Sequence, residues 1–310
     1  MKKQIGFTLI ELMIALALGL VVVAAATLLF LTGVRSQAMQ QGVSDLQDNA
    51  NFGLNYITQD IRLANLNNVA AEVNDQLLLG GIVVSQNNYP NALRPQPDPL
   101  NPTAALPPMS QTLLSSSGGG VSNVAQGSDQ LVIQYQPMEA GGFDCEGREI
   151  NNSNRIIVQR YFLRADGNQA AGEANPLALA CDAGHYTVGD DTVVNYGDAG
   201  EIIMKRVDYF RVLLDVANAA GQQRYIAVND YLALSTKPRI LGVSLGVLTR
   251  SAQSVGRDQA IAQNNAFTVL DQNVQVVSTG NPTGYIRRVV TQDIALRNAL
   301  GEREEVKDAK

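Results

Sequence analysis

The chain has 310 residues, of which 45% are hydrophobic and 17% charged, and its net charge is −6. The hydrophobic content excludes a disordered or collagen-like polymer, and the length allows two ordinary domains. The acidic balance argues against a nucleic-acid partner, and no Lys/Arg cluster is longer than a pair such as Lys2-Lys3 or Arg287-Arg288. One histidine, His185, and two cysteines are a poor set of ligands for a zinc site or a catalytic triad.

The N-terminal segment is strongly apolar. Lys2 and Lys3 precede the uncharged stretch 12–31, which is long enough to cross a bilayer. A cleaved Sec signal peptide with small residues at 24–26 is one alternative, but the apolar run continues past that site. Glu11 stands near the start of the run, where a lone carboxylate needs a partner. Either it pairs with a cation or it reaches toward the lipid headgroups.

The sequence Gly-Phe-Thr-Leu-Ile-Glu-Leu at 6–12 resembles the class III signal of type IV prepilins and type II secretion pseudopilins. The resemblance implies that a membrane prepilin peptidase cuts after Gly6 and methylates the new amino terminus, Phe7. It also implies that Glu11 forms an assembly salt bridge with the Phe7 amino group of a neighbouring subunit. Two opposite charges in a poorly screened medium can select one axial register between subunits, so the physics agrees with this expectation.

After Arg35 the pattern becomes amphipathic without a proline or a strong turn signal. One helical stripe recurs at spacings of three and four residues: Val43, Leu46, Ala50, Leu54, Ile57, Ile61 and Ala64. We expect one helix from Phe7 to about Leu66. The expected organisation is a leader at 1–6, a transmembrane helix half at 7–33, an amphipathic helix half at 34–68 and a globular head at 69–310.

The head is expected to be rich in β-structure. A Pro/Gly/Ser-rich loop is predicted over 85–128, and Asp166 to Asn168 and Asn218 to Gly221 are predicted turns. The predicted strands are 130–136, 155–163, 207–216, 225–228, 240–249 and 285–296. The fold class is therefore α+β, with a long N-terminal helix packed on a mainly antiparallel sheet.

Lys2 and Lys3 place the N-terminus in the cytoplasm and the head outside it, by the positive-inside rule. In an oxidising compartment an even number of cysteines favours a disulfide between Cys145 and Cys181, with a buried thiol pair as the alternative. His185, Asp190, Asp191 and Asp198 lie close in sequence, but their spacing fits no calcium loop, and a solvated loop is expected. No catalytic residue, cofactor or metal site is predicted.

Segments 144–147, 207–215, 240–251 and 287–298 resemble those of PilW-family minor pilins. The resemblance implies a non-catalytic subunit of a type IV pilus that primes assembly near the tip and supports adhesion and twitching motility. Its expected partners are other minor pilins, the major pilin, the prepilin peptidase, the inner-membrane assembly platform, a tip-associated adhesin and membrane lipid. It would be a single-pass inner-membrane protein before assembly and part of the surface filament afterwards. The alternatives are a type II secretion minor pseudopilin and a membrane-tethered binding protein or enzyme.

Overall fold

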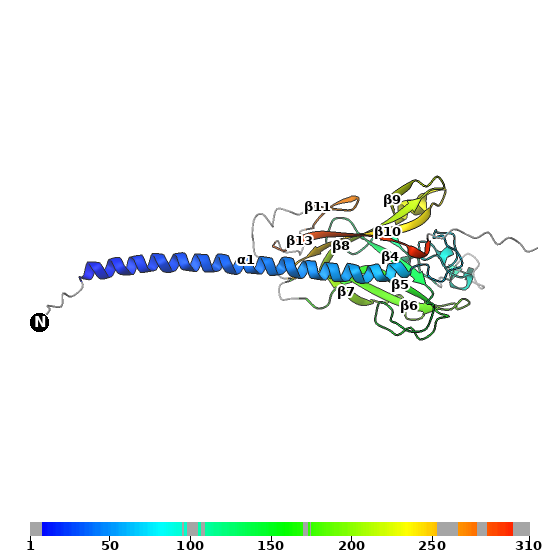
Figure 1. The fold of residues 1–310 in the computed structure, drawn as a ribbon, viewed down its shortest axis with the longest axis horizontal. Coiled ribbons are helices and arrows are strands. Elements are labelled where there is room, and N and C mark those ends of the chain that lie inside the picture. The colour runs from blue at the N-terminus through cyan, green and yellow to red at the C-terminus, as the bar shows by residue number, and fades with distance from the viewer. Residues whose placement is uncertain are drawn as a thin grey trace, which may run out of the picture.

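The computed structural model describes residues 8–94, 96–97, 105–106, 109–169, 173, 175–252, 266–277 and 284–299. Its dominant element is helix α1, Leu9–Leu63, which is continuous over 55 residues and therefore about 80 Å long. The first half of α1 projects away from the head, and the second half lies along the sheets (Figure 1). The predicted α+β class with a long N-terminal helix is confirmed.

Two antiparallel sheets form the head. The five-stranded sheet has the order β3-β4-β5-β6-β7, and the four-stranded sheet has the order β13-β10-β8-β9. The strands of the first sheet are β3 Ser116–Gly120, β4 Ser128–Tyr135, β5 Ile156–Ala165, β6 Leu177–Tyr186 and β7 Glu201–Lys205. Those of the second are β8 Val207–Ala217, β9 Gln223–Ala227, β10 Arg239–Arg250 and β13 Arg287–Ala295. Each of the six predicted strands overlaps one of these.

Smaller elements lie outside the two main sheets. Helix α2, Val228–Ala233, follows β9, and two further hairpins pair outside the main sheets. The hairpins are β1 Gln96–Pro97 with β2 Ala105–Leu106, and β11 Ala266–Val269 with β12 Gln272–Gln275. Single 3-10 turns occur at Gln86–Asn88, Asn91–Leu93, Gln111–Leu113 and Arg297–Ala299.

The two sheets meet where the chain passes from β7 to β8. Arg206, the one residue between these strands, has φ 59°, and this left-handed conformation turns the chain from one sheet into the other. A buried carboxylate ties the sheets together at β4: Asp129 accepts hydrogen bonds from the backbone N–H of Val212 in β8 at 2.8 Å and of Gly118 in β3 at 2.7 Å. Three strands are therefore anchored by one side chain.

The core lies between α1 and both sheets. The predicted helix stripe is buried from Leu46 to Ala64, and Val43 at its start is half-buried. It packs in one cluster with residues of β4, β5, β7, β8, β10 and β13, such as Ile133, Tyr161 and Met204. Gly53 also belongs to this face, because a Cβ there would lie 2.5 Å from Met204 Cε.

The helix ends earlier than expected. Ala64 leaves the helical conformation with φ −50° and ψ 137°, and Asn65 follows with φ 65°. Asparagine adopts this left-handed region more readily than most residues, and its side chain accepts a hydrogen bond from Gly81 N–H at 3.0 Å. The helix therefore stops at Leu63 and not near Leu66.

The structure also contains strands that were not predicted. Strand β3 lies inside the expected 85–128 loop. Close to it, only glycine fits at position 127, because a Cβ there would lie 2.2 Å from the Gly118 carbonyl oxygen. Strand β6 is buried on both faces and contains four alanine or glycine residues, so it shows neither alternation nor strong β-propensity. Strands β7, β11 and β12 are four or five residues long, and none of them was predicted.

Candidate functional site

The exposed half of α1 is the first candidate. Every residue from Leu9 to Ala38 is exposed, including Leu20 at 73% and Leu29 at 75%. Within the described part of the chain, α1 is the one helix whose length and composition would allow it to cross a membrane; an 18-residue window has a mean hydropathy of 2.8 and no buried residue. An apolar surface of this size requires lipid or other helices to cover it.

The N-terminus of α1 carries a reciprocal cap. Thr8 N–H donates to Glu11 Oε2 at 3.3 Å, and Glu11 N–H donates to Thr8 Oγ1 at 3.3 Å. This is a capping box, in which a threonine and a glutamate three residues later each satisfy a backbone N–H that the helix leaves unpaired. The spacing of a threonine and a glutamate three residues apart is the sequence signature of this cap.

The cap bears on the predicted assembly role of Glu11. Gly6 and Phe7, the expected cleavage and methylation residues, lie outside the described residues. Among the residues that are described, no cation contacts the exposed carboxylate of Glu11. Its predicted pairing with a neighbouring Phe7 amine stays a prediction.

The two cysteines meet beneath the second half of α1. Cys145 and Cys181 form a disulfide with Cα atoms 6.1 Å apart, and both residues are buried. The bond joins the loop before β5 to strand β6. Tyr56 of α1 donates its hydroxyl to the Cys145 carbonyl oxygen at 3.2 Å. Helix, loop and sheet are therefore connected at one point.

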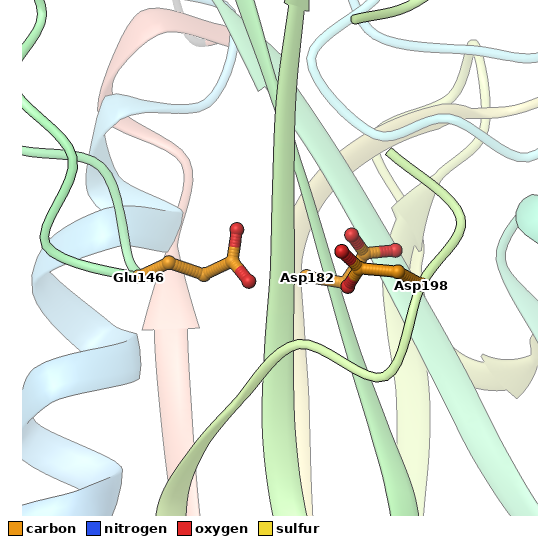
Figure 2. Close-up of side chains that lie close together, drawn as sticks. All are labelled: Glu146, Asp182 and Asp198. Atoms are coloured by element: carbon orange, nitrogen blue, oxygen red, sulfur yellow. The ribbon is translucent and has the colours of Figure 1, made fainter. Parts of the chain in front are cut away.

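The structure separates the polar residues that were predicted to share a solvated loop. His185 lies in β6. Its pKa is below the usual value, mainly because of burial and also because of the nearby positive charge of Arg155. Asp190 accepts a hydrogen bond from Thr187 N–H at 2.7 Å and closes a local turn, and Asp191 is exposed. Asp198 instead lies beside Asp182 of β6 and Glu146 of the disulfide loop (Figure 2).

An ionic network that was not predicted lies at the ends of β8, β10 and β13. Buried or nearly buried arginines contact carboxylates that are distant in sequence. The pairs are Arg206 with Asp166 at 2.5 Å, Arg250 with Glu173 at 2.9 Å and Arg287 with Asp208 at 2.7 Å. The sequence separations are 40, 77 and 79 residues. No local pattern predicts these pairs, and their positions indicate that they hold strand ends together.

Comparisons with known proteins identify two regions. The prokaryotic N-terminal methylation motif matches residues 1–27, and the family described as type IV pilus-assembly protein W matches residues 160–298. The second match covers β6 to β13 and most of β5. No curated protein matches the sequence.

A solved structure similar to this chain is a type IV-like pilin from Thermus thermophilus. The two sequences are 14% identical, the alignment covers 82% of this chain and 96% of that chain, and the TM-score is 0.37.

Proposed function

Because the chain belongs to the PilW family of type IV pilin-like minor pilins, we propose that it is a non-catalytic subunit that enters a pilus filament through the exposed half of α1. The observation that carries the proposal is the division of one continuous helix into an unburied apolar half and a half built into the core of the head. A rigid element of this kind transmits the position of the helix in a filament directly to the head.

Processing would prepare the helix for assembly. Cleavage between Gly6 and Phe7 would remove Lys2 and Lys3 and leave an α-amino cation next to the start of α1. A peptidase that requires a small residue before the cut would not process Gly6→Val, and the uncut protein would accumulate in the membrane. Intact mass and N-terminal sequencing of the mature protein test this step; an N-terminus at Thr27 would indicate a Sec signal instead.

Glu11 would then form a salt bridge with an adjacent subunit. In a bundle of apolar helices, an unpaired carboxylate is costly, and the Phe7 amine of an adjacent pilin offers a partner. We propose that the chain is held in the inner membrane with its N-terminus inside, joins the major and other minor pilins at the assembly platform, and primes filaments near a tip that carries an adhesin.

The substitution Glu11→Gln isolates the charge from the cap. Glutamine at this position still completes a capping box, so the helix start is preserved while the carboxylate is lost. We expect Glu11→Gln to leave the head folded and to weaken association with other pilins by about a hundredfold, which crosslinking to those pilins would detect. The matched variant Thr8→Val removes the cap and keeps the charge. If Thr8→Val impairs crosslinking as much as Glu11→Gln does, the carboxylate acts through the cap and the intersubunit pairing is wrong.

Deletion of the gene with complementation tests the function itself. A priming minor pilin predicts few surface pili and lost twitching in the deletion strain, and crosslinks from the chain to other pilins in sheared filaments. Intact piliation with impaired protein secretion would favour a type II secretion pseudopilin. Intact piliation and intact secretion would favour a membrane-tethered binding protein.

A further inference from the structure

Three carboxylates from separate segments converge on one face of the head. Glu146 follows the disulfide cysteine Cys145, Asp182 lies in β6, and Asp198 precedes β7. One carboxylate oxygen from each lies within 4.8 Å of the others. In Figure 2 the carboxylate of Glu146 points toward those of Asp182 and Asp198, which overlap in this view.

Each carboxylate is positioned by one of its two oxygens. Asp182 Oδ2 accepts from Arg160 Nε at 3.0 Å and from Gly197 N–H at 2.9 Å. Asp198 Oδ1 accepts from Gly200 N–H at 2.7 Å. These bonds fix the orientation of both side chains.

Glu146 is held in the same way. Its Oε2 accepts from Ala183 N–H at 3.1 Å and contacts the guanidinium of Arg148. The remaining oxygens, Glu146 Oε1, Asp182 Oδ1 and Asp198 Oδ2, accept no hydrogen bond from any residue that the structure describes.

Asp182 differs from an ordinary surface carboxylate in its burial. The residue is completely buried, and its Oδ1 has no partner within the described structure. Buried acceptors are almost always paired, and this unpaired oxygen belongs to a side chain that lies beside two other carboxylates, so it points to a missing positive ligand.

The charges around the cluster do not cancel. Arg160 pairs with Asp182, and Arg148 bridges Glu146 and Asp144. Four carboxylates therefore face two guanidiniums, and two negative charges remain. Both guanidiniums contact the positioning oxygens, which leaves the unpaired oxygens open to a further cation.

We propose that Glu146, Asp182 and Asp198 bind one divalent cation and that the site prefers Ca²⁺ to Mg²⁺. The donors are all carboxylate oxygens, which hard cations favour. Because each pair of these oxygens is at most 4.8 Å apart, a point within about 2.8 Å of all three exists, and a small contraction brings it to the Ca²⁺–O distance of about 2.3–2.6 Å. Mg²⁺ requires about 2.0–2.1 Å and near-ideal octahedral geometry, whereas Ca²⁺ accepts a more irregular set of oxygens such as three separate segments supply.

A bound ion would join the disulfide loop, β6 and the segment before β7. The test uses the full chain in detergent after treatment with a chelator and titrates it with CaCl₂ or MgCl₂ by calorimetry and thermal unfolding. We expect one Ca²⁺ per chain and a Tm that rises by about 5 °C at saturation, with a smaller effect of Mg²⁺.

The variant Asp198→Asn separates this site from adventitious binding. Its amide oxygen can still accept from Gly200 N–H, so the loop is retained, and Ca²⁺ affinity should fall at least about tenfold. Asp191→Asn, a nearby exposed control, should bind as the wild type does. The proposal is overturned if about 10 mM CaCl₂ produces neither heat nor a Tm shift, or if Asp198→Asn binds as tightly as the wild type. The test is independent of the pilus assignment.

Discussion

The two halves of α1 share one backbone and have opposite surroundings. From Leu9 to Ala38 every side chain is exposed, whereas seven residues between Leu46 and Ile61 are buried in the head. The first half is apolar on all faces, and the second half is apolar along one stripe. A helix that is apolar on all sides has no single face that packs on the rest of its own chain, so it is suited to lipid or to several partner helices. A helix with a single apolar stripe packs that stripe against one core.

The comparison predicts that substitutions near the second half change the stability of the head and that equivalent substitutions in the first half do not. The largest expected effect is loss of the disulfide beneath α1. Cys145 and Cys181 are separated by 36 residues, and releasing a loop of this length costs about 4 kcal/mol in loop-closure entropy. Cys145→Ser should lower the free energy of unfolding by about this amount in urea titrations of the full chain. Reduction of the wild type should have the same effect, and an unchanged midpoint after reduction would contradict the prediction.

A matched pair of isoleucines tests the two halves directly. Ile57 is fully buried and Ile14 is 55% exposed, and both lie in α1. Ile57→Ala leaves a cavity in the core and should cost about 3 kcal/mol. Ile14→Ala should change the stability of the head by less than about 0.5 kcal/mol. Equal losses in urea titrations would show that the first half also packs on the head.

The end of α1 is held by the C-terminal part of the chain. Asn298 donates its side-chain N–H groups to the carbonyl oxygens of Arg62 and Ala64, each at 3.1 Å. These carbonyls have no partner within the helix, so Asn298→Ala should destabilise the head by about 1–2 kcal/mol. Hydrogen exchange should show faster opening of the last turn of α1. Unchanged exchange at residues 60–64 would indicate that water replaces the asparagine without cost.

The smallest expected effect concerns a carboxyl on the packed face. Burial raises the pKa of Asp60 to about 6, while a hydrogen bond from Tyr161 at 2.8 Å opposes the shift and Asp144 adds to it. Because the folded pKa lies above the unfolded value, this group stabilises the fold at low pH, and that contribution is lost as the pH rises through about 6.

Asp60→Asn should therefore remove this part of the pH dependence. The shift corresponds to roughly 3 kcal/mol, which partial exposure reduces to about 1 kcal/mol. We expect the variant to be more stable than the wild type at about pH 8 by that amount, and nearly equal to it at about pH 3.5. Urea titrations across this range measure the difference, with the exposed Asp48→Asn on the same helix as the control. Parallel pH profiles for Asp60→Asn and the wild type would exclude a role of Asp60.

Local patterns were sufficient for the elements whose surroundings repeat along the chain. The uninterrupted apolar run and the stripe ending at Ala64 predicted both halves of α1, because helical periodicity records which faces meet water. Strands β8 and β10 were predicted from their β-branched and aromatic residues, although both are buried along nearly their whole length. The family resemblance of residues 6–12 agrees with the methylation motif that matches residues 1–27.

Tertiary structure alone decided the features that depend on long-range contacts. Strand β6 is covered on both faces, so its sequence does not alternate. Asp182 and Asp198 are close in sequence, but Glu146 joins them only because the disulfide loop packs beside β6. The same holds for Arg287 and Asp208, which are 79 residues apart. Periodicity describes the surroundings of a single element, whereas these clusters arise from the way in which several elements pack, and short-range patterns carry no information on that packing.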